Sequence, residues 1–588
     1  MNVILSLVFV IGYEILSANA QSRDYWNDLA YNNLQKALNL QNLNQNVAKN
    51  VIFFLGDGMT VTTLTAARIL KGQQAGNTGE ETVLSWETFS SVGLSKTYNT
   101  NKQTPDSAGT ATALFCGVKT KAKVIAVDDQ VEYGNCSSIA NASVDSVMTQ
   151  SQRAGKSVGF ISTTRVTHAT PACLYAHSPD RGWENNVPLD ERQAGCIDIA
   201  AQLVEGDNKE IRVIMGGGRQ KLTDTNTADP EYPGKTGQRT DGRNIINEWM
   251  EGKDTERAKY VWNLEDFNAV DPEDTDYLMG LFERDHMQYE NYRKDDAAGE
   301  PSIAEMTEKA IKILQKDEDG FFLMVEGGRI DMAHHKGKAS DALQDTLAME
   351  AAVAKAMELT NEEDTLIIVT SDHSHTMMFS GYPSRGNPIL GLVNNVKGSD
   401  GLPYTTLSYA NGPGGRTVAD SFHETGKRPS LTGTDTERAG YVQDALVPLQ
   451  EETHGGDDVA IFANGPMAHL IYGTHEQNYI AHVVQYAACI GAYAEECDSD
   501  DRGAATIVPS MSAATILPSM SYTEDSDNDN MSAATSVPSM SAATILPSIT
   551  NAKRCNNDYS DAATLVSNMT FWTLLILAFI TTTLFNSQ

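Results

Sequence analysis

The sequence predicts an α/β fold: a large, mostly parallel central sheet with helices on both faces. Between about residues 50 and 490, apolar strand-like runs alternate with stretches of helical periodicity. The strongest runs, residues 51–55, 321–325 and 366–369, are continuously apolar, which is typical of parallel strands buried on both faces. Residues 381–453 are rich in Gly, Pro and Thr without periodicity, so we expect an insertion with its own small fold there.

Composition limits the classes of partner. The 588 residues carry a formal charge of −33, from 44 basic and 77 acidic side chains. Because binding to a phosphate backbone needs basic surface, this balance argues against nucleic acid as a partner. It suits a solvated acidic surface, or carboxylates gathered around cations.

The N-terminus resembles an export signal. Residues 2–17 are largely apolar and precede Ala18-Asn19-Ala20, an A-x-A cleavage pattern. We therefore expect residues 1–20 to be a signal peptide, although the stretch lacks an early Lys or Arg. The alternative is an N-terminal membrane anchor.

The C-terminal part differs in character from the rest. Residues 498–560 repeat a short unit, "AATIVPSMS", "AATILPSMS" and variants, which cannot bury a core and predicts an O-glycosylated stalk. Residues 561–588 end in the apolar run "FWTLLILAFI" after a polar spacer, as in a removed GPI-anchor signal. We expect attachment at Ser560, with Asn557 and Asp561 as alternatives; a tail-anchored helix is the other interpretation. The globular part would then sit on the extracellular face of the cell membrane.

Seven cysteines in an exported chain predict disulfides. Cys489 and Cys497 can close a small loop, and Cys136 and Cys196 a longer one. Cys116, Cys173 and Cys555 remain, so at least one thiol is left without an intrachain partner. Asn135 and Asn141 lie in N-x-S sequons and are candidate glycosylation sites.

Side chains that bind metals follow each of the three apolar runs. They are Asp57 after the first, Glu326 and Asp331 after the second, and Asp372, His373 and His375 after the third. Because ligands gather at the carboxyl ends of parallel strands, we expect them to converge. Asp331 and His335 share a face if their segment is helical. Mixed Asp and His suit Zn²⁺, and oxygens alone suit Mg²⁺. Turn chemistry, a helix N-terminal acid and an ordinary loop histidine are the alternatives.

A serine between an aspartate and small residues stands in "PDSAGTAT", residues 105–112. Ser107 has the setting of a nucleophile in an open site, and equally that of a helix N-cap. No histidine is adjacent in sequence, so a nucleophilic Ser107 would need activation by a metal ion.

Six segments together resemble animal alkaline phosphatases, in order and approximate spacing, over about residues 23–497. They are "VIFFLGDGM", "TPDSAGTATA", "TTRVTHATPA", "VEGGRIDMAHH", "TSDHSHTMMFSGYP" and "ETHGGDDVAIFANGP". The resemblance implies a catalytic domain over residues 21–497, with a small crown-type domain inserted at about 381–453. It also implies hydrolysis of phosphate monoesters through a phosphoserine intermediate, and a homodimer.

The resemblance also implies roles for individual residues. Ser107 would be the nucleophile and Arg181 the phosphate-binding arginine. One zinc ion would take Asp331, His335 and His454, a second zinc ion Asp57, Asp372 and His373, and a magnesium ion Asp57, Thr170 and Glu326. His168 and His375 would lie beside the metals. A calcium ion would take Glu231, Phe282 (main chain), Glu283 and Glu300, the last standing where the family usually has Asp.

Two other functions are compatible with parts of the sequence. A related phosphodiesterase usually has Thr as nucleophile, and a sulfatase modifies a Cys or Ser in a different motif. A surface receptor without catalysis would be expected to have lost ligands, whereas every expected metal position here carries a competent side chain.

Overall fold

The computed structural model describes residues 23–39 and 43–495. The predicted signal peptide, stalk and GPI signal, with Ser560, lie outside these residues. No helix in the described part of the chain is long and apolar enough to cross a membrane.

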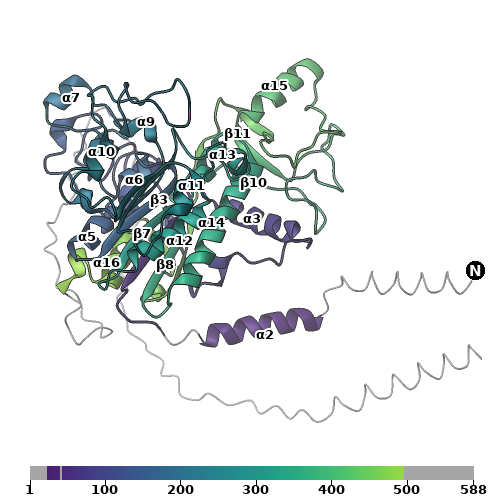
Figure 1. The fold of residues 1–588 in the computed structure, drawn as a ribbon. Helices are drawn as coiled ribbons and strands as arrows, with labels where there is room; N and C mark the ends of the chain where they lie inside the picture. The colour runs from purple at the N-terminus through teal and green to yellow at the C-terminus, as the bar shows by residue number, and fades with distance from the viewer. Residues whose placement is uncertain (1–22, 40–42, 496–588) are drawn as a thin grey trace, which may run out of the picture. The chain divides into compact units, whose positions relative to one another are not determined.

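A ten-stranded sheet forms the centre of the described fold (Figure 1). Its order is β15-β2-β14-β8-β1-β7-β3-β4-β6-β5, and β14 alone runs antiparallel to its two neighbours. The strands are β1 (Asn50–Leu55), β2 (Ser91–Lys96), β3 (Ser157–Arg165), β4 (Val213–Gly217), β5 (Ala258–Val261), β6 (Tyr277–Glu283), β7 (Phe321–Glu326), β8 (Thr365–Thr370), β14 (Val459–Asn464) and β15 (Gly473–Glu476). The predicted mostly parallel sheet is confirmed.

Both faces of this sheet are buried. Along β1, Phe53 packs in one core cluster with residues of the helices α4, α5 and α16, while Phe54 packs in another with residues of α12 and α14. These helices span Ser107–Cys116 (α4), Val147–Arg153 (α5), Tyr479–Ala488 (α16), Ile303–Leu314 (α12) and Ala339–Leu359 (α14). Alternate residues of an extended strand point to opposite faces, which explains why these runs are apolar at every position.

The described residues also form further α-helices. They are α2 (Arg23–Asn39), α3 (Val61–Gln74), α6 (Ala169–Ala172), α7 (Leu189–Gln193), α8 (Ile199–Gln202), α9 (Arg219–Leu222), α10 (Ile245–Met250), α11 (Leu264–Ala269), α13 (Arg329–His335) and α15 (Gly414–Thr425). The helix α12 begins with a capping box, in which Ser302 and Glu305 bond each other's backbone amides.

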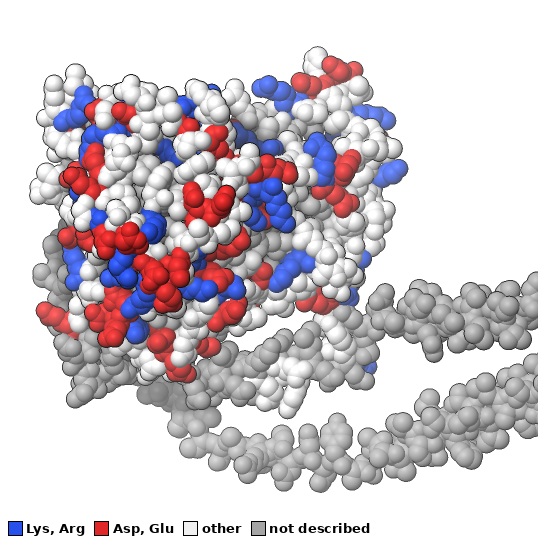
Figure 2. Space-filling model, viewed as in Figure 1, with Lys and Arg blue, Asp and Glu red and all other residues white. Residues whose placement is uncertain are grey.

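Separate small sheets lie in the stretch around residues 374–455. One joins β10 (Met377–Phe379), β11 (Leu407–Gly412) and β12 (Ala445–Pro448), and α15 packs near it. The other pairs β9 (Ser374–His375) with β13 (His454–Gly455). On the face drawn in Figure 2, acidic and basic side chains are interspersed over the surface.

Candidate active site and metal centre

Three carboxylates meet at one edge of the sheet because of strand register. Leu55 of β1 pairs with Glu326 at the end of β7 and with Thr370 at the end of β8. Asp57 lies two residues after Leu55, and Asp372 lies two residues after Thr370; both carboxylates are fully buried. The structure therefore brings the acids of all three apolar runs to the carboxyl ends of adjacent parallel strands.

The first ligand cluster joins α13 to β13. Asp331 and His335 occupy i and i+4 of α13, as expected for one helix face. The Oδ1 atom of Asp331 lies 3.3 Å from Nε2 of His335 and 3.3 Å from Nε2 of His454. The two Nε2 atoms are 3.1 Å apart.

Backbone carbonyls orient both of these imidazoles. Nδ1 of His335 lies 2.6 Å from the carbonyl oxygen of Glu452, and Nδ1 of His454 lies 2.8 Å from that of Pro105. When each Nδ1–H donates to its carbonyl, the Nε2 lone pair is left free to bind a metal ion.

The second cluster joins the loops after β1 and β8 to the start of α4. Nε2 of His373 lies 3.4 Å from Oδ1 of Asp57, 3.2 Å from Oδ2 of Asp372 and 3.1 Å from Oγ of Ser107. Asp372 also accepts hydrogen bonds from the Gly58 amide and the Thr110 hydroxyl. These bonds fix the carboxylate relative to α4.

Both clusters fit tetrahedral metal ions. Ligand atoms 2.0–2.1 Å from a tetrahedral zinc ion are about 3.3 Å from one another. The atoms of the first set are 3.1–3.3 Å apart, and Nε2 of His373 lies 3.4 and 3.2 Å from the two carboxylates of the second set. Both carboxylate oxygens of Asp57 are buried without a hydrogen-bond donor. Burial and the neighbouring charge of Asp372 raise the pKa of Asp57 well above its usual value. A bound cation would offset this repulsion and satisfy the oxygens.

A third cluster shares Asp57 with the second. Asp57, His168 and Glu326 each present a ligand atom within 4.8 Å of the others. Burial raises the pKa of Glu326 to about 7, against the lowering effect of the Ser162, Thr170 and Thr164 hydroxyls beside it. Thr170, in the short helix α6, is fully buried. Oxygen donors dominate here, which suits Mg²⁺.

The structure corrects the N-cap alternative for Ser107. The cap of α4 is Asp106, whose backbone is extended and whose carboxylate accepts a hydrogen bond from the Gly109 amide at 3.3 Å. Ser107 is the first helical residue. With Asp106 in the capping position, the Ser107 hydroxyl is free to face the second cluster.

Arg181 contacts Asp106, the residue before Ser107, and is also held by His168. Its guanidinium donates to Oδ2 of Asp106 at 3.0 Å and lies 3.1 Å from Nε2 of His168. Burial, followed by the charge of Arg181, lowers the pKa of His168 well below its usual value, so His168 is neutral. A neutral imidazole can accept from the guanidinium, leaving other N–H groups for an anion.

Glu452 contacts His375 from a position to which the sequence assigned no role. Its carboxylate accepts from Nδ1 of His375 at 2.5 Å and from the amide and hydroxyl of Thr376. Nε2 of His375 lies 2.7 Å from Oδ1 of Asp331. Burial opposes charge on His375, but Glu452 and Asp331 outweigh it and raise its pKa to about 10. The only sequence signal was the nearness of Glu452 to His454, and no spacing rule identifies such a contact.

The acidic residues expected to bind calcium also lie near one another. Glu231, Glu283 and Asp296 present oxygens within 4.8 Å of one another, so Asp296 joins a group in which it was not expected. Glu300 accepts from the Gln288 amide, and burial followed by the charge of Glu283 raises its pKa to about 8. Glu231 also bonds the buried guanidinium of Arg219.

The alkaline phosphatase family model matches residues 48–490, which include both ligand clusters and Ser107. The chain belongs to the alkaline phosphatase family. It is 50% identical over 481 residues to the tissue-nonspecific alkaline phosphatase of Felis catus, covering 81% of this chain and 90% of that one. It is 48% identical over 472 residues to the alkaline phosphatase of Gadus morhua, covering 79% and 97%. The chain is therefore a metal-dependent phosphate monoester hydrolase.

Solved alkaline phosphatases share the fold. The enzyme from the Antarctic bacterium TAB5 aligns with a TM-score of 0.51 at 22% identity, over 75% of this chain and 98% of that one. The Thermus thermophilus enzyme aligns with a TM-score of 0.53 at 22% identity, over 77% and 93%.

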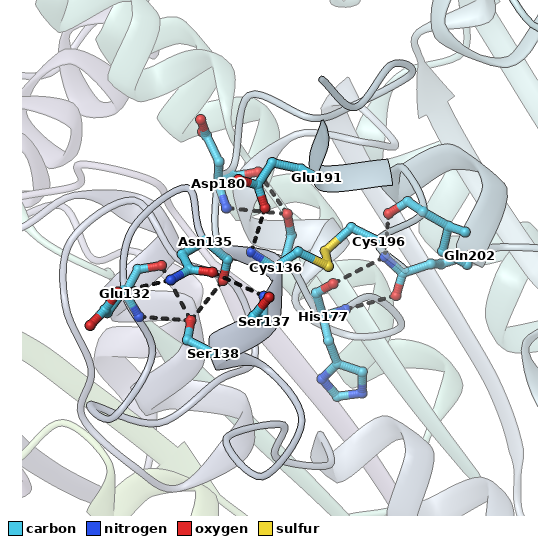
Figure 3. The surroundings of a disulfide bond; sticks show 12 residues. Glu132, Asn135, Cys136, Ser137, Ser138, His177, Asp180, Glu191, Cys196 and Gln202 are labelled. Atoms are coloured by element: carbon cyan, nitrogen blue, oxygen red, sulfur yellow. Dashed lines mark hydrogen bonds between the residues drawn. A yellow bond between two sulfur atoms is a disulfide. The ribbon is translucent and has the colours of Figure 1, made fainter. Parts of the chain in front are cut away.

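The expected disulfide Cys136–Cys196 is present, with Cα atoms 5.7 Å apart (Figure 3). Cys489 is disulfide-bonded, and its expected partner Cys497 lies outside the described residues. Asn135, half-buried beside the disulfide, bonds the Ser137 amide through its side chain, whereas Asn141 is exposed.

Proposed function

We propose that this phosphatase transfers the phosphoryl group to Ser107 and then hydrolyses the resulting phosphoserine. The observation that carries the proposal is the position of Ser107, whose Oγ lies 3.1 Å from His373 within the second ligand cluster. Ser107 also opens a ten-residue helix, α4, whose N-terminal amides favour phosphate oxygens. Attack by Oγ on phosphorus forms the Ser107 O–P bond and breaks the bond to the leaving alcohol.

In this proposal two zinc ions and one magnesium ion are bound. Asp331, His335 and His454 would hold the first zinc ion, and Asp57, Asp372 and His373 the second. Asp57, Thr170 and Glu326 would hold magnesium. When bound, the zinc ions supply Lewis-acid chemistry, lowering the pKa of hydroxyl groups and stabilising negative charge on oxygen. The spacing of about 3.3 Å between ligand atoms supports zinc at the first two positions.

Arg181 would bind the phosphate. Its planar fork can donate two parallel hydrogen bonds to phosphate oxygens, a geometry that lysine lacks. The contacts with Asp106 and His168 hold the guanidinium beside Ser107 before substrate arrives, so less side-chain entropy is lost on binding.

The variant Ser107→Ala tests the nucleophile. We expect turnover of an aryl phosphate to fall by at least about 10³-fold, while zinc and magnesium content stay at the wild-type level. Trapping with ³²P-labelled substrate at acidic pH should label the wild type and not the variant. Wild-type turnover in Ser107→Ala, or label recovered on another residue, would contradict the assignment.

A calcium ion at Glu231, the Phe282 carbonyl, Glu283 and Glu300 is a further proposal. Burial, together with the charge of Glu283, raises the pKa of Glu231 to about 7 and that of Glu300 to about 8, and a bound cation would offset both effects. Because the structure also places Asp296 in the group, calcium binding by Glu300→Gln and Asp296→Asn, followed calorimetrically, would distinguish the two as ligands.

We also propose a homodimer on the outer cell surface, attached through a GPI anchor at Ser560. Large exposed apolar side chains support a dimer interface. Trp26 and Tyr31 are exposed on α2, and in the 381–453 segment Tyr382 is 85% exposed and Leu446 is 80% exposed. Light scattering measures the oligomeric state.

The GPI anchor is tested separately. Phosphatidylinositol-specific phospholipase should release the activity from intact cells, whereas a tail-anchored helix would resist release.

A further inference from the structure

Two buried cysteines that the phosphatase chemistry does not use lie sulfur to sulfur. Cys116 is 7% exposed and Cys173 is 1% exposed, and both carry free thiols in this structure. Their Sγ atoms are 3.7 Å apart, although the residues are 57 positions apart in the chain. Cys173 also lies 3.8 Å from the hydroxyl of Thr112, one helical turn before Cys116.

The two thiols lie at the C-terminal ends of two helices that carry residues of the candidate active site. Cys116 is the last residue of α4, which begins at Ser107. Cys173 directly follows α6, which carries Thr170. The two helices pack against each other. A covalent bond between the thiols would therefore tie the helix of the nucleophile to the helix of the proposed magnesium ligand.

We propose that Cys116 and Cys173 are a modification site at which the mature protein forms a further intrachain disulfide. A disulfide has sulfurs about 2.05 Å apart, so the two Sγ atoms need to approach by about 1.7 Å. Side-chain rotation and small shifts of the two helix ends can supply this. The same chain already contains the Cys136–Cys196 disulfide and a disulfide-bonded Cys489, which indicates an oxidising compartment.

The oxidation needs a disulfide as oxidant, such as oxidised glutathione. The thiolate of one cysteine attacks a sulfur of the oxidant and releases one glutathione thiol. The second cysteine thiolate then attacks the mixed disulfide and releases the other. The chain loses two protons and two electrons, and the oxidant becomes two thiols. Because both cysteines are buried after folding, the exchange belongs to folding, before α4 and α6 pack together.

The bond would stabilise the region beneath the active site against heat. Closing a loop of this length restricts the unfolded chain, and for a protein of this size the gain corresponds to a shift of about 4 °C in the temperature of half-inactivation. Neither cysteine contacts the ligand clusters in the described residues, so turnover at low temperature should not depend on the bond.

Peptide mapping of the full-length protein, expressed through a secretory pathway, tests the proposal. The protein is unfolded without reductant in the presence of iodoacetamide and digested with trypsin, which separates the two cysteines. We expect the Cys116 and Cys173 peptides to be cross-linked, in the same digest as the Cys136–Cys196 link. Carbamidomethyl groups on both Cys116 and Cys173, with Cys136–Cys196 linked, would overturn the proposal.

The variant Cys173→Ala gives a second readout. Its Cys116 should become fully alkylated in denaturant, and its temperature of half-inactivation should fall by about 4 °C. The double variant with Cys116→Ala should lose no more than the single one, because either change removes the bond. Two thiols that only pack together would give destabilised variants without cross-linked wild-type peptides, and that result would also overturn the proposal.

Discussion

The contact between Glu452 and His375 predicts the effect of one nearly isosteric change. In Glu452→Gln the side chain keeps its shape but loses the charge that faces Nδ1 of His375 at 2.5 Å. His375 in turn lies 2.7 Å from Oδ1 of Asp331. The side-chain amide therefore weakens the contact through which His375 orients Asp331, while the Glu452 carbonyl that holds His335 is unchanged.

The expected magnitude follows from comparable outer hydrogen bonds to metal ligands. Loss of such a partner typically weakens metal binding about 10–100-fold, which is about 1.4–2.7 kcal/mol. Glu452 also accepts from the amide and hydroxyl of Thr376, and a glutamine oxygen can retain those bonds. We therefore expect the protein to fold, and the loss to fall on zinc affinity.

The assay is competition for zinc between the protein and a chromophoric chelator, with kcat measured again at saturating zinc. Excess zinc should restore most of the turnover. The matched control is Glu451→Gln, the same change on a 60% exposed side chain that pairs with Lys336. Wild-type zinc affinity in Glu452→Gln, or an equal loss in Glu451→Gln, would refute the positioning role.

Three further changes have defined outcomes. Arg181→Lys should lower kcat/KM for an aryl phosphate and raise the inhibition constant of inorganic phosphate, each by about 10–100-fold, because one of two charged hydrogen bonds is lost. Unchanged inhibition by phosphate would contradict binding of phosphate by two hydrogen bonds from Arg181. At Gly58 the backbone is left-handed (φ +69°), and in Gly58→Ala the new Cβ would lie 2.4 Å from Cδ2 of His375, so we expect the free energy of unfolding to fall by about 2–4 kcal/mol. The control Gly76→Ala is also left-handed but has open space around the new Cβ, and should lose about 1 kcal/mol. Equal losses would refute the steric argument. In metal-free protein, burial raises the pKa of Asp345 to about 8 and the carboxylates around His375 overcome burial to raise its pKa to about 10. Asp345 and His375 hold protons that the unfolded chain has largely lost by pH 7, so stability falls as the pH rises. With these pKa values, the free energy of unfolding falls by about 1 kcal/mol for each group between pH 7 and 8. Asp345→Asn should remove the contribution of Asp345, measured by denaturant unfolding, and an unchanged slope would contradict the assignment.

The sequence by itself predicted the fold class and the side chains that the structure gathers at the carboxyl ends of the strands. Runs such as residues 51–55 are apolar at every position only because both sheet faces are covered, and Asp57 follows at the strand end where ligands gather. The i, i+4 spacing of Asp331 and His335 needed only helical geometry to put them on one face.

The tertiary structure alone decided which of these residues meet and what holds them. The pairing of β13 with β9 brings His454 within 3.3 Å of Asp331, across more than a hundred residues of chain. The tertiary structure also shows that Asp106 caps the helix α4 and that Glu452 contacts His375. Such contacts depend on register and packing between segments far apart in the chain, and local periodicity and propensity carry no information about them.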